Sequence, residues 1–126
     1  MSAPSVERAL ILAPQGRDAQ VAGGILREAS VQVEICRDLA HLLAEIRRGA
    51  ELAILTEEAL AGVDVAPLTR WVSSQPPWSD FPFVVLTRHG GGLERNPTAA
   101  RMTGLLGNVA FLERPFHPTT LVSAVC

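Results

Sequence analysis

Short apolar segments alternate with segments of helical periodicity five times along this chain, and this alternation restricts the fold more than any other feature. The expected strands are 9–13, 31–35, 52–55, 81–87 and 109–112. The expected helices are 19–29, the segment between Asp38 and Gly49, 65–74, 98–106 and the residues from 119 on. Strand–helix alternation indicates a parallel sheet with helices on both faces. Because crossovers are right-handed, we expect a three-layer, doubly wound α/β domain with a five-stranded parallel sheet.

The polarity of a strand indicates its place in the sheet. Segment 9–13 is apolar on both faces, as in a buried parallel strand. Segment 31–35 alternates apolar and polar residues, which indicates an edge strand with one face in water. Asp18 and Asp38 stand where N-caps of the following helices are expected, and Gly49 stands where the second helix should end.

The composition is that of one globular domain, with 48% hydrophobic and 19% charged residues in a chain of 126. The net charge is -2 and the sequence contains no lysine, so we expect no nucleic-acid partner. No apolar run approaches the ~20 residues of a membrane helix, and the first residues lack a secretory leader pattern. We therefore expect no membrane association and a cytoplasmic location.

The two cysteines, Cys36 and Cys126, are far apart in the sequence. Cys36 lies in an alternating apolar run, which favours a buried thiol over a disulfide or a metal ligand. The apolar pattern of the last expected helix is unfinished at Cys126. We therefore expect residues 1–126 to be a single domain from a longer protein.

Ligands of doubly wound folds bind beyond the carboxyl ends of the strands, so these ends form the candidate site. Glu57 and Glu58 follow the third expected strand, whereas Arg88 and Arg114 follow the fourth and fifth. Because opposite charges lie at adjacent strand ends, we hypothesise an ion pair between one of these arginines and one of these glutamates. The alternative is that Glu57 and Glu58 form a solvated turn.

Three segments at these strand ends, in their order and spacing, resemble the receiver domains of bacterial response regulators. The segments are 51–56, 86–87 and the Phe-Leu-Glu-Arg-Pro-Phe run at 111–116. The resemblance extends from about residue 9 to residue 126. It implies a flavodoxin-like sheet of strand order 2-1-3-4-5 and a role in two-component signal transduction and phosphorelay.

The family's phosphorylation chemistry depends on positions that differ here. The resemblance places Pro14 and Gln15 at the acidic pair that holds Mg²⁺ in the family, and Thr56 at the phospho-acceptor aspartate. Arg114 replaces the family's lysine, and only Thr87 matches in kind. Proline offers no side-chain ligand, glutamine offers a neutral amide, and threonine cannot form an acyl phosphate. We therefore expect no aspartyl phosphorylation, no catalytic residue, and no bound metal or cofactor.

The resemblance also implies a contact surface on the fourth helix, fifth strand and fifth helix. The candidate interface residues are Arg101, Leu105, Phe111 and Glu113, through which we expect a homodimer. Phe111 stands at the family's aromatic switch position. Its alternative interpretation is an aromatic side chain packed, partly buried, at the sheet edge.

The predicted function is that of a non-enzymatic pseudo-receiver, which acts by protein–protein docking or dimerisation. The implied partner is a histidine kinase or another domain of the same polypeptide. One alternative is a pocket that responds to a small ligand or cation through Glu57, Glu58, Thr87 and Arg114. Another is a small flavodoxin-like enzyme, although the sequence offers no nucleophile–base pair and no cofactor-binding loop. Segment 90–92 is expected to be a flexible insertion or a docking element.

Overall fold

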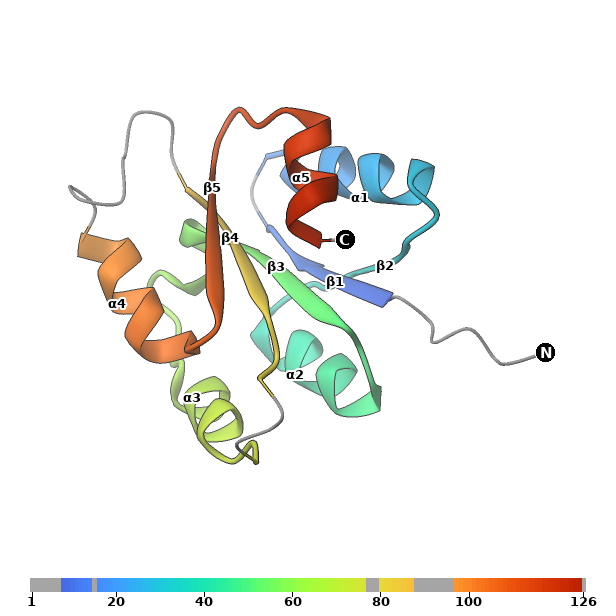
Figure 1. The fold of residues 1–126 in the computed structure, drawn as a ribbon. Helices are drawn as coiled ribbons and strands as arrows, with labels where there is room; N and C mark the ends of the chain where they lie inside the picture. Colours follow the sequence, from blue (N-terminus) through green and yellow to red (C-terminus); the bar gives the residue numbers. More distant parts are fainter. Residues whose placement is uncertain (1–7, 15, 77–79, 88–96, 126) are drawn as a thin grey trace.

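The computed structural model of the chain describes residues 8–125 except 15, 77–79 and 88–96. Its strands form one parallel sheet in the order β2-β1-β3-β4-β5 (Figure 1). They are β1 (Arg8–Leu12), β2 (Gln32–Ile35), β3 (Leu52–Thr56), β4 (Phe83–Thr87) and β5 (Val109–Glu113). The predicted fold class, a doubly wound five-stranded parallel sheet of this strand order, is confirmed. The predictions for Gln15, Arg88 and segment 90–92 lie outside the described residues.

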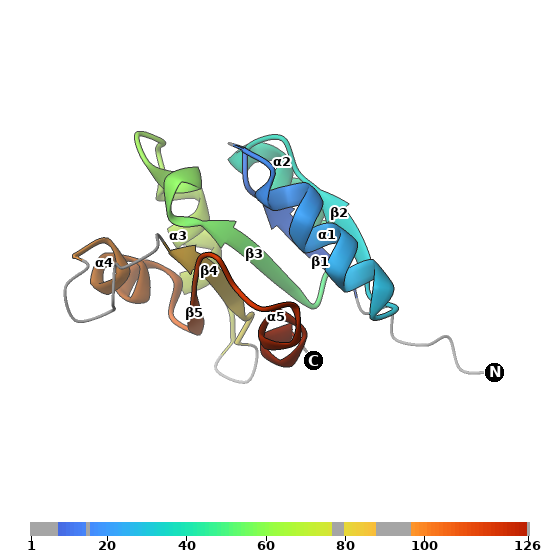
Figure 2. The ribbon, with the colours of Figure 1, turned by 90° about the horizontal axis from the view of Figure 1, so that it is seen from above.

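Helices cover both faces of the sheet (Figures 1 and 2). Helices α1 (Asp18–Glu28) and α5 (Pro118–Val125) lie on one face, and α2 (Leu39–Arg48), α3 (Ala66–Ser73) and α4 (Pro97–Leu106) lie on the other. Successive side chains of a strand point to opposite faces. Leu10 and Leu12 of β1 therefore join the core under α2, α3 and α4, whereas Ala9 and Ile11 join the core under α1 and α5.

Burial along the strands follows their order in the sheet. Every residue of the central strands β3 and β4 is buried. The outer strands β2 and β5 are partly exposed. The edge position predicted for segment 31–35 is confirmed, because β2 lies at the end of the strand order, next to β1.

The two predicted helix caps have different outcomes. The Asp38 side chain accepts a hydrogen bond from the His41 backbone N–H at 2.8 Å, so it caps α2 as predicted. The prediction that Asp18 is an N-cap was wrong, because Arg17 holds the cap position and Asp18 is the first residue of α1. An acidic residue in the first turn still interacts favourably with the helix dipole. Its carboxylate is also drawn into an ion pair, described below.

Two strand boundaries differ from their predictions for local reasons. Strand β2 begins at Gln32, because the Val31 N–H donates to the Leu26 carbonyl and completes the end of α1. Strand β4 begins at Phe83, after Pro82, which has no N–H for the sheet. Among the described residues, no helix is long and apolar enough to cross a lipid bilayer.

A 3₁₀ helix that the sequence did not predict follows β3. This helix, η1, spans Glu57–Leu60. Its residues Glu57, Ala59 and Leu60 are buried, so the segment after β3 is not simply a solvated turn. The element fixes both glutamates at the carboxyl end of the sheet, where ligand sites of this architecture form.

Candidate functional site

The carboxyl ends of β3, β4 and β5 meet at one edge of the sheet. Thr56 is the last residue of β3, where it pairs in register with Leu86, and Thr87 pairs with Glu113 at the end of β5. Thr56 and Thr87 are 2% and 5% exposed. Both hydroxyls are therefore inside the protein, whereas Glu113 at the end of β5 is exposed.

Arg114, the residue after β5, makes polar contacts with three other elements. Its Nη2 donates to both carboxylate oxygens of Glu58 at 2.8 Å, and its Nη1 donates to Asp18 Oδ2 at 2.8 Å. Its Nε donates to the Thr87 carbonyl oxygen at 2.9 Å. We call Arg114, Glu58, Asp18 and the Thr87 carbonyl the Arg114 cluster. It joins the start of α1, the 3₁₀ helix η1 and the end of β4.

The Arg114 cluster is partly shielded from water. The Arg114 side chain is 18% exposed, and those of Glu58 and Asp18 are 28% and 32% exposed. Burial disfavours the charged guanidinium, but its hydrogen bonds to Glu58 and Asp18 outweigh that effect and raise the pKa of Arg114. Charge-assisted hydrogen bonds of this kind are short and about twice as strong as neutral ones. The guanidinium is therefore a permanent positive charge between two carboxylates.

The hypothesised ion pair between a basic and an acidic strand end is present for Arg114 and Glu58. Its signal in the sequence was opposite charge at neighbouring strand ends. The contribution of Asp18 was missed, because its place before a helix suggested a capping role. From the segment after β1, the structure brings Asp18 to the cluster, whereas Pro14 is an exposed residue just beyond that strand.

Glu57 and the predicted interface residues differ in their burial. Glu57 is buried in η1, one residue before Glu58. Phe111 is partly buried and packs against the core under α2, α3 and α4, as does Leu105. The interpretation of Phe111 as an aromatic side chain packed at the sheet edge therefore holds. Arg101 and Glu113 are exposed.

No candidate metal site is found within the described ranges: they contain no group of three or more histidine, cysteine, aspartate or glutamate side chains placed to hold a metal ion. The carboxylates of Glu58 and Asp18 are instead paired with Arg114. This edge of the sheet therefore presents charged side chains that are held in place by their ion pairs.

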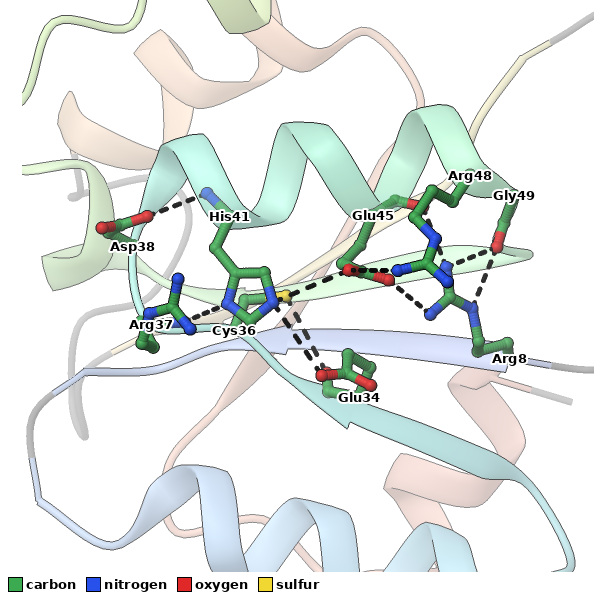
Figure 3. Close-up of polar contacts among 9 residues, drawn as sticks. All are labelled: Arg8, Glu34, Cys36, Arg37, Asp38, His41, Glu45, Arg48 and Gly49. Carbon is green, nitrogen blue, oxygen red and sulfur yellow. Dashed lines mark hydrogen bonds and ion pairs between the residues drawn. The ribbon is translucent and has the colours of Figure 1, made fainter.

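A second polar cluster joins β1, β2 and α2 (Figure 3). It was not predicted from the sequence. We call Arg8, Glu34, His41 and Glu45 the Arg8 cluster, since His41 Nε2 lies 3.7 Å from Glu45 Oε2 and 3.9 Å from Glu34 Oε2. Arg8 Nη1 donates to Glu45 Oε1 at 2.8 Å, and Arg8 Nη2 donates to the Gly49 carbonyl at 2.7 Å. Arg8 thereby satisfies a carbonyl at the end of α2, where helices have unpaired acceptors. The cluster attaches α2 to the first strand.

The pKa values of Glu45, within the Arg8 cluster, and of the nearby Cys36 are both shifted. The hydrogen bond from Arg8 lowers the pKa of Glu45 below its usual value. Burial, assisted by Glu34 and Glu45, raises the pKa of the Cys36 thiol to about 11. The predicted buried thiol at Cys36 is confirmed, since this residue is 3% exposed and has a free thiol.

Comparison with solved structures identifies the fold. The chain superimposes on a Chloroflexus aurantiacus protein described as a response regulator with a TM-score of 0.73 and 22% identity, over 94% of this chain and 93% of that one. The signal receiver domain of an HD domain-containing protein from Pseudomonas fluorescens gives a TM-score of 0.72 and 18% identity, over 94% and 90%. Full-length FixJ from B. japonicum gives 0.71 and 21%, over 94% of this chain and 55% of that one.

These likenesses show that the chain has the fold of receiver domains. No family model matches the sequence. No curated protein matches it either.

Proposed function

We propose that this chain is a non-enzymatic pseudo-receiver domain of two-component-type signalling, which acts by protein–protein docking or dimerisation without aspartyl phosphorylation. The observation that carries the proposal is the Arg114 cluster. In a receiver fold this strand-end edge is where phosphoryl chemistry would take place, and here its cationic residue is held by two carboxylates of the same chain.

The residue types at this edge support the proposal. Thr56, at the position that the resemblance assigns to the acceptor, carries a buried hydroxyl and no carboxylate. An acyl phosphate requires a carboxylate, and the nearby carboxylate of Glu58 is occupied by Arg114. A phosphoryl group at Glu58 would have to displace this guanidinium contact. In this proposal, the fixed negative charge of Glu58 beside Arg114 replaces the reversible negative charge of a phosphoryl group.

The partner surface that we propose is the one formed by α4 and β5. It includes the exposed Arg101 and Glu113 and the partly buried Leu105 and Phe111, which pack against the core. The proposed partners are a histidine kinase or other domains of a longer signalling protein, and a second copy of this chain. FixJ supports the longer protein as a context, because this chain spans 55% of its length.

The first experiment is a backbone amide NMR titration of the chain with Mg²⁺ and beryllofluoride, a mimic of the phosphoryl group. The expected result is an unchanged spectrum, because Thr56 offers no acceptor carboxylate and Pro14 and Gln15 stand at the positions of the family's acidic pair. The matched positive control is the triple variant Pro14→Asp, Gln15→Asp and Thr56→Asp, which supplies these groups. Shifts in the wild-type chain at Thr56, Glu58, Thr87 or Arg114 would overturn the proposal.

The docking part of the proposal has a separate test. Sedimentation velocity over a range of protein concentrations should show a dimer that Arg101→Glu weakens. The matched control is Arg47→Glu, which reverses an exposed charge on α2, away from the proposed surface. A chain that remains monomeric at high concentration, or an equal effect of both variants, would contradict a homodimer through α4 and β5.

A further inference from the structure

A pocket of about 250 Å³ lies between the segment that follows β3 and helix α4. Its walls carry groups of three kinds. Glu57 and Glu58 contribute carboxylates, Arg101 contributes a guanidinium, and Leu60, Met102 and Leu105 contribute apolar surface. The pocket therefore combines negative charge, positive charge and an apolar wall in one small space.

The apolar wall is firmly built into the core. Leu60 and Met102 are 4% and 3% exposed, so both are fixed by packing. Met102 and Leu105 are one helical turn apart and lie on the same side of α4. Arg101 precedes Met102, is exposed, and also lines the pocket. The charged groups thus lie around a preformed apolar surface.

The location of the pocket also favours a binding site. Glu57 and Glu58 follow the carboxyl end of β3, and ligands of doubly wound sheets bind outside these strand ends. Ligand sites usually combine a largely apolar lining with a few convergent polar groups, in cavities of roughly 300–1,000 Å³. The volume of this pocket, about 250 Å³, is just below this range and fits a molecule smaller than most drugs.

We propose that this pocket binds a small zwitterion of the α-amino acid class with an aliphatic side chain. Its ammonium group would lie against Glu57 and Glu58, and its carboxylate against Arg101. Its side chain would pack on Leu60, Met102 and Leu105. The proposal rests on the proposed function in one respect, since it requires that this edge of the sheet does not carry a phosphoryl group.

Binding of such a ligand is coupled to the Arg114 cluster through Glu58. Glu58 lines the pocket and also accepts both hydrogen bonds from Arg114 Nη2. An ammonium group at Glu58 would share or replace the contact with Arg114. Because Arg114 follows β5, occupation of the pocket would alter the end of the strand that forms the proposed docking surface. Two sites coupled in this way influence each other's affinity equally.

The test uses three probes that differ by one charged group each, L-leucine, 3-methylbutylamine and 4-methylpentanoate. The amine lacks the carboxylate of leucine, and the acid lacks its ammonium group. Backbone amide NMR titrations should show leucine shifting the signals of 60–62 and 101–105. The amine and the acid should each bind at least about tenfold more weakly than leucine, because each loses one charge-assisted contact. Equal binding of leucine and the amine, or no shift with any probe, overturns the proposal.

Variants locate the site. Arg101→Ala should weaken leucine binding about tenfold and leave the affinity for the amine unchanged. Glu58→Gln should weaken both, but it also loses part of the Arg114 ion pair. Ala61→Trp therefore serves as a second variant. Ala61 lines the pocket and is exposed, and the substitution retains the backbone N–H at this position. It should block leucine binding without removing a charge. Unchanged leucine affinity in Ala61→Trp overturns the assignment, and Arg47→Ala is the matched control.

The outcomes separate this inference from the proposed function. Each sample that is titrated with leucine is also titrated with Mg²⁺ and beryllofluoride. Silence toward both kinds of ligand overturns the amino-acid pocket and leaves the pseudo-receiver proposal standing. A response to beryllofluoride overturns the pseudo-receiver proposal, and with it the premise of this inference.

Discussion

Arg114 Nη2 lies 2.8 Å from both carboxylate oxygens of Glu58, although the two residues are 56 positions apart in the chain. The contact joins the end of β5 to the 3₁₀ helix η1 that follows β3. Because Asp18 approaches the same guanidinium from the start of α1, one cation forms ion pairs with carboxylates from two separate segments. The carboxyl edge of the sheet is therefore held together by charge as well as by packing.

Removal of this guanidinium should destabilise the fold measurably. Arg114→Ala removes the Arg114 ion pairs of Glu58 and Asp18, and it removes the hydrogen bond to the Thr87 carbonyl. We expect a loss of about 2–3 kcal/mol in the free energy of unfolding, since partly shielded carboxylates would lose charged hydrogen bonds. Urea unfolding followed by circular dichroism measures this loss.

Two further variants test the cause of that loss. Arg114→Lys keeps the charge but cannot span all three partners, so its stability should lie between those of Arg114→Ala and the wild type. Arg70→Ala removes an exposed arginine of α3 and should change stability by less than about 0.5 kcal/mol. If Arg114→Ala were no more destabilising than Arg70→Ala, the cluster would contribute nothing to the fold.

The elements of the fold could be predicted from the sequence because each carries a local signal. The apolar run of β1, the alternation of β2 and the Asp38 cap depend on residues that are close together in the chain. Helix η1 was missed because its residues Glu57 and Glu58 are not apolar at helical spacing, and a single 3₁₀ turn leaves no periodic pattern.

The side-chain clusters were predicted only in part, because they depend on three-dimensional proximity. Adjacent strand order and opposite charge were enough to suggest Arg114 with Glu58. They were not enough to suggest Asp18, whose position before a helix had a sufficient local explanation. Arg8 and Glu45 are 37 residues apart and lie on different kinds of element, so nothing local connects them.

Stability in acid should depend on Glu45. Its pKa in the folded protein is lowered from 4.5, chiefly by the hydrogen bond from Arg8. A carboxyl group with a depressed folded pKa stabilises the protein above its unfolded pKa, and this contribution is lost as the pH falls through the folded pKa. Glu45→Gln should therefore be less stable than the wild type at neutral pH, with a difference that shrinks below about pH 4.

The measurement for Glu45 is the urea midpoint of both proteins at a series of pH values. Comparison of the two proteins removes the contributions of other carboxylates that titrate in the same range. Glu28→Gln, which alters an exposed residue of α1, is the matched control. The difference in urea midpoint between Glu28→Gln and the wild type should be nearly the same at every pH. A constant difference between Glu45→Gln and the wild type at every pH would contradict the role assigned to Arg8.

Gly24 should be a site where alanine stabilises the protein. The residue lies inside α1, and among the described atoms none lies within 4 Å of a Cβ built on it. Alanine has a higher helix propensity and reduces the freedom of the unfolded chain, so Gly24→Ala should add about 0.5–1 kcal/mol. Thermal unfolding measures the gain.

The matched control for Gly24 is Gly49→Ala. Gly49 ends α2 with a φ of 115°, which is unfavourable for any residue with a side chain. The same substitution should therefore cost about 1–3 kcal/mol there. Stabilisation at both positions, or at neither, would show that backbone conformation does not decide the effect.

The Cys36 thiol should be unreactive while the protein is folded. Its pKa is raised from 9.0 to about 11 by burial and by the carboxylates of Glu34 and Glu45, and the thiolate is the reactive form. At pH 8 its thiolate fraction should be on the order of 100-fold lower than that of an ordinary cysteine. In a Cys126→Ser background, the disulfide reagent DTNB should label Cys36 rapidly in urea and barely in buffer. Rapid labelling of the folded protein would contradict this prediction and would mean that the structure around the Cys36 thiol opens readily to solvent.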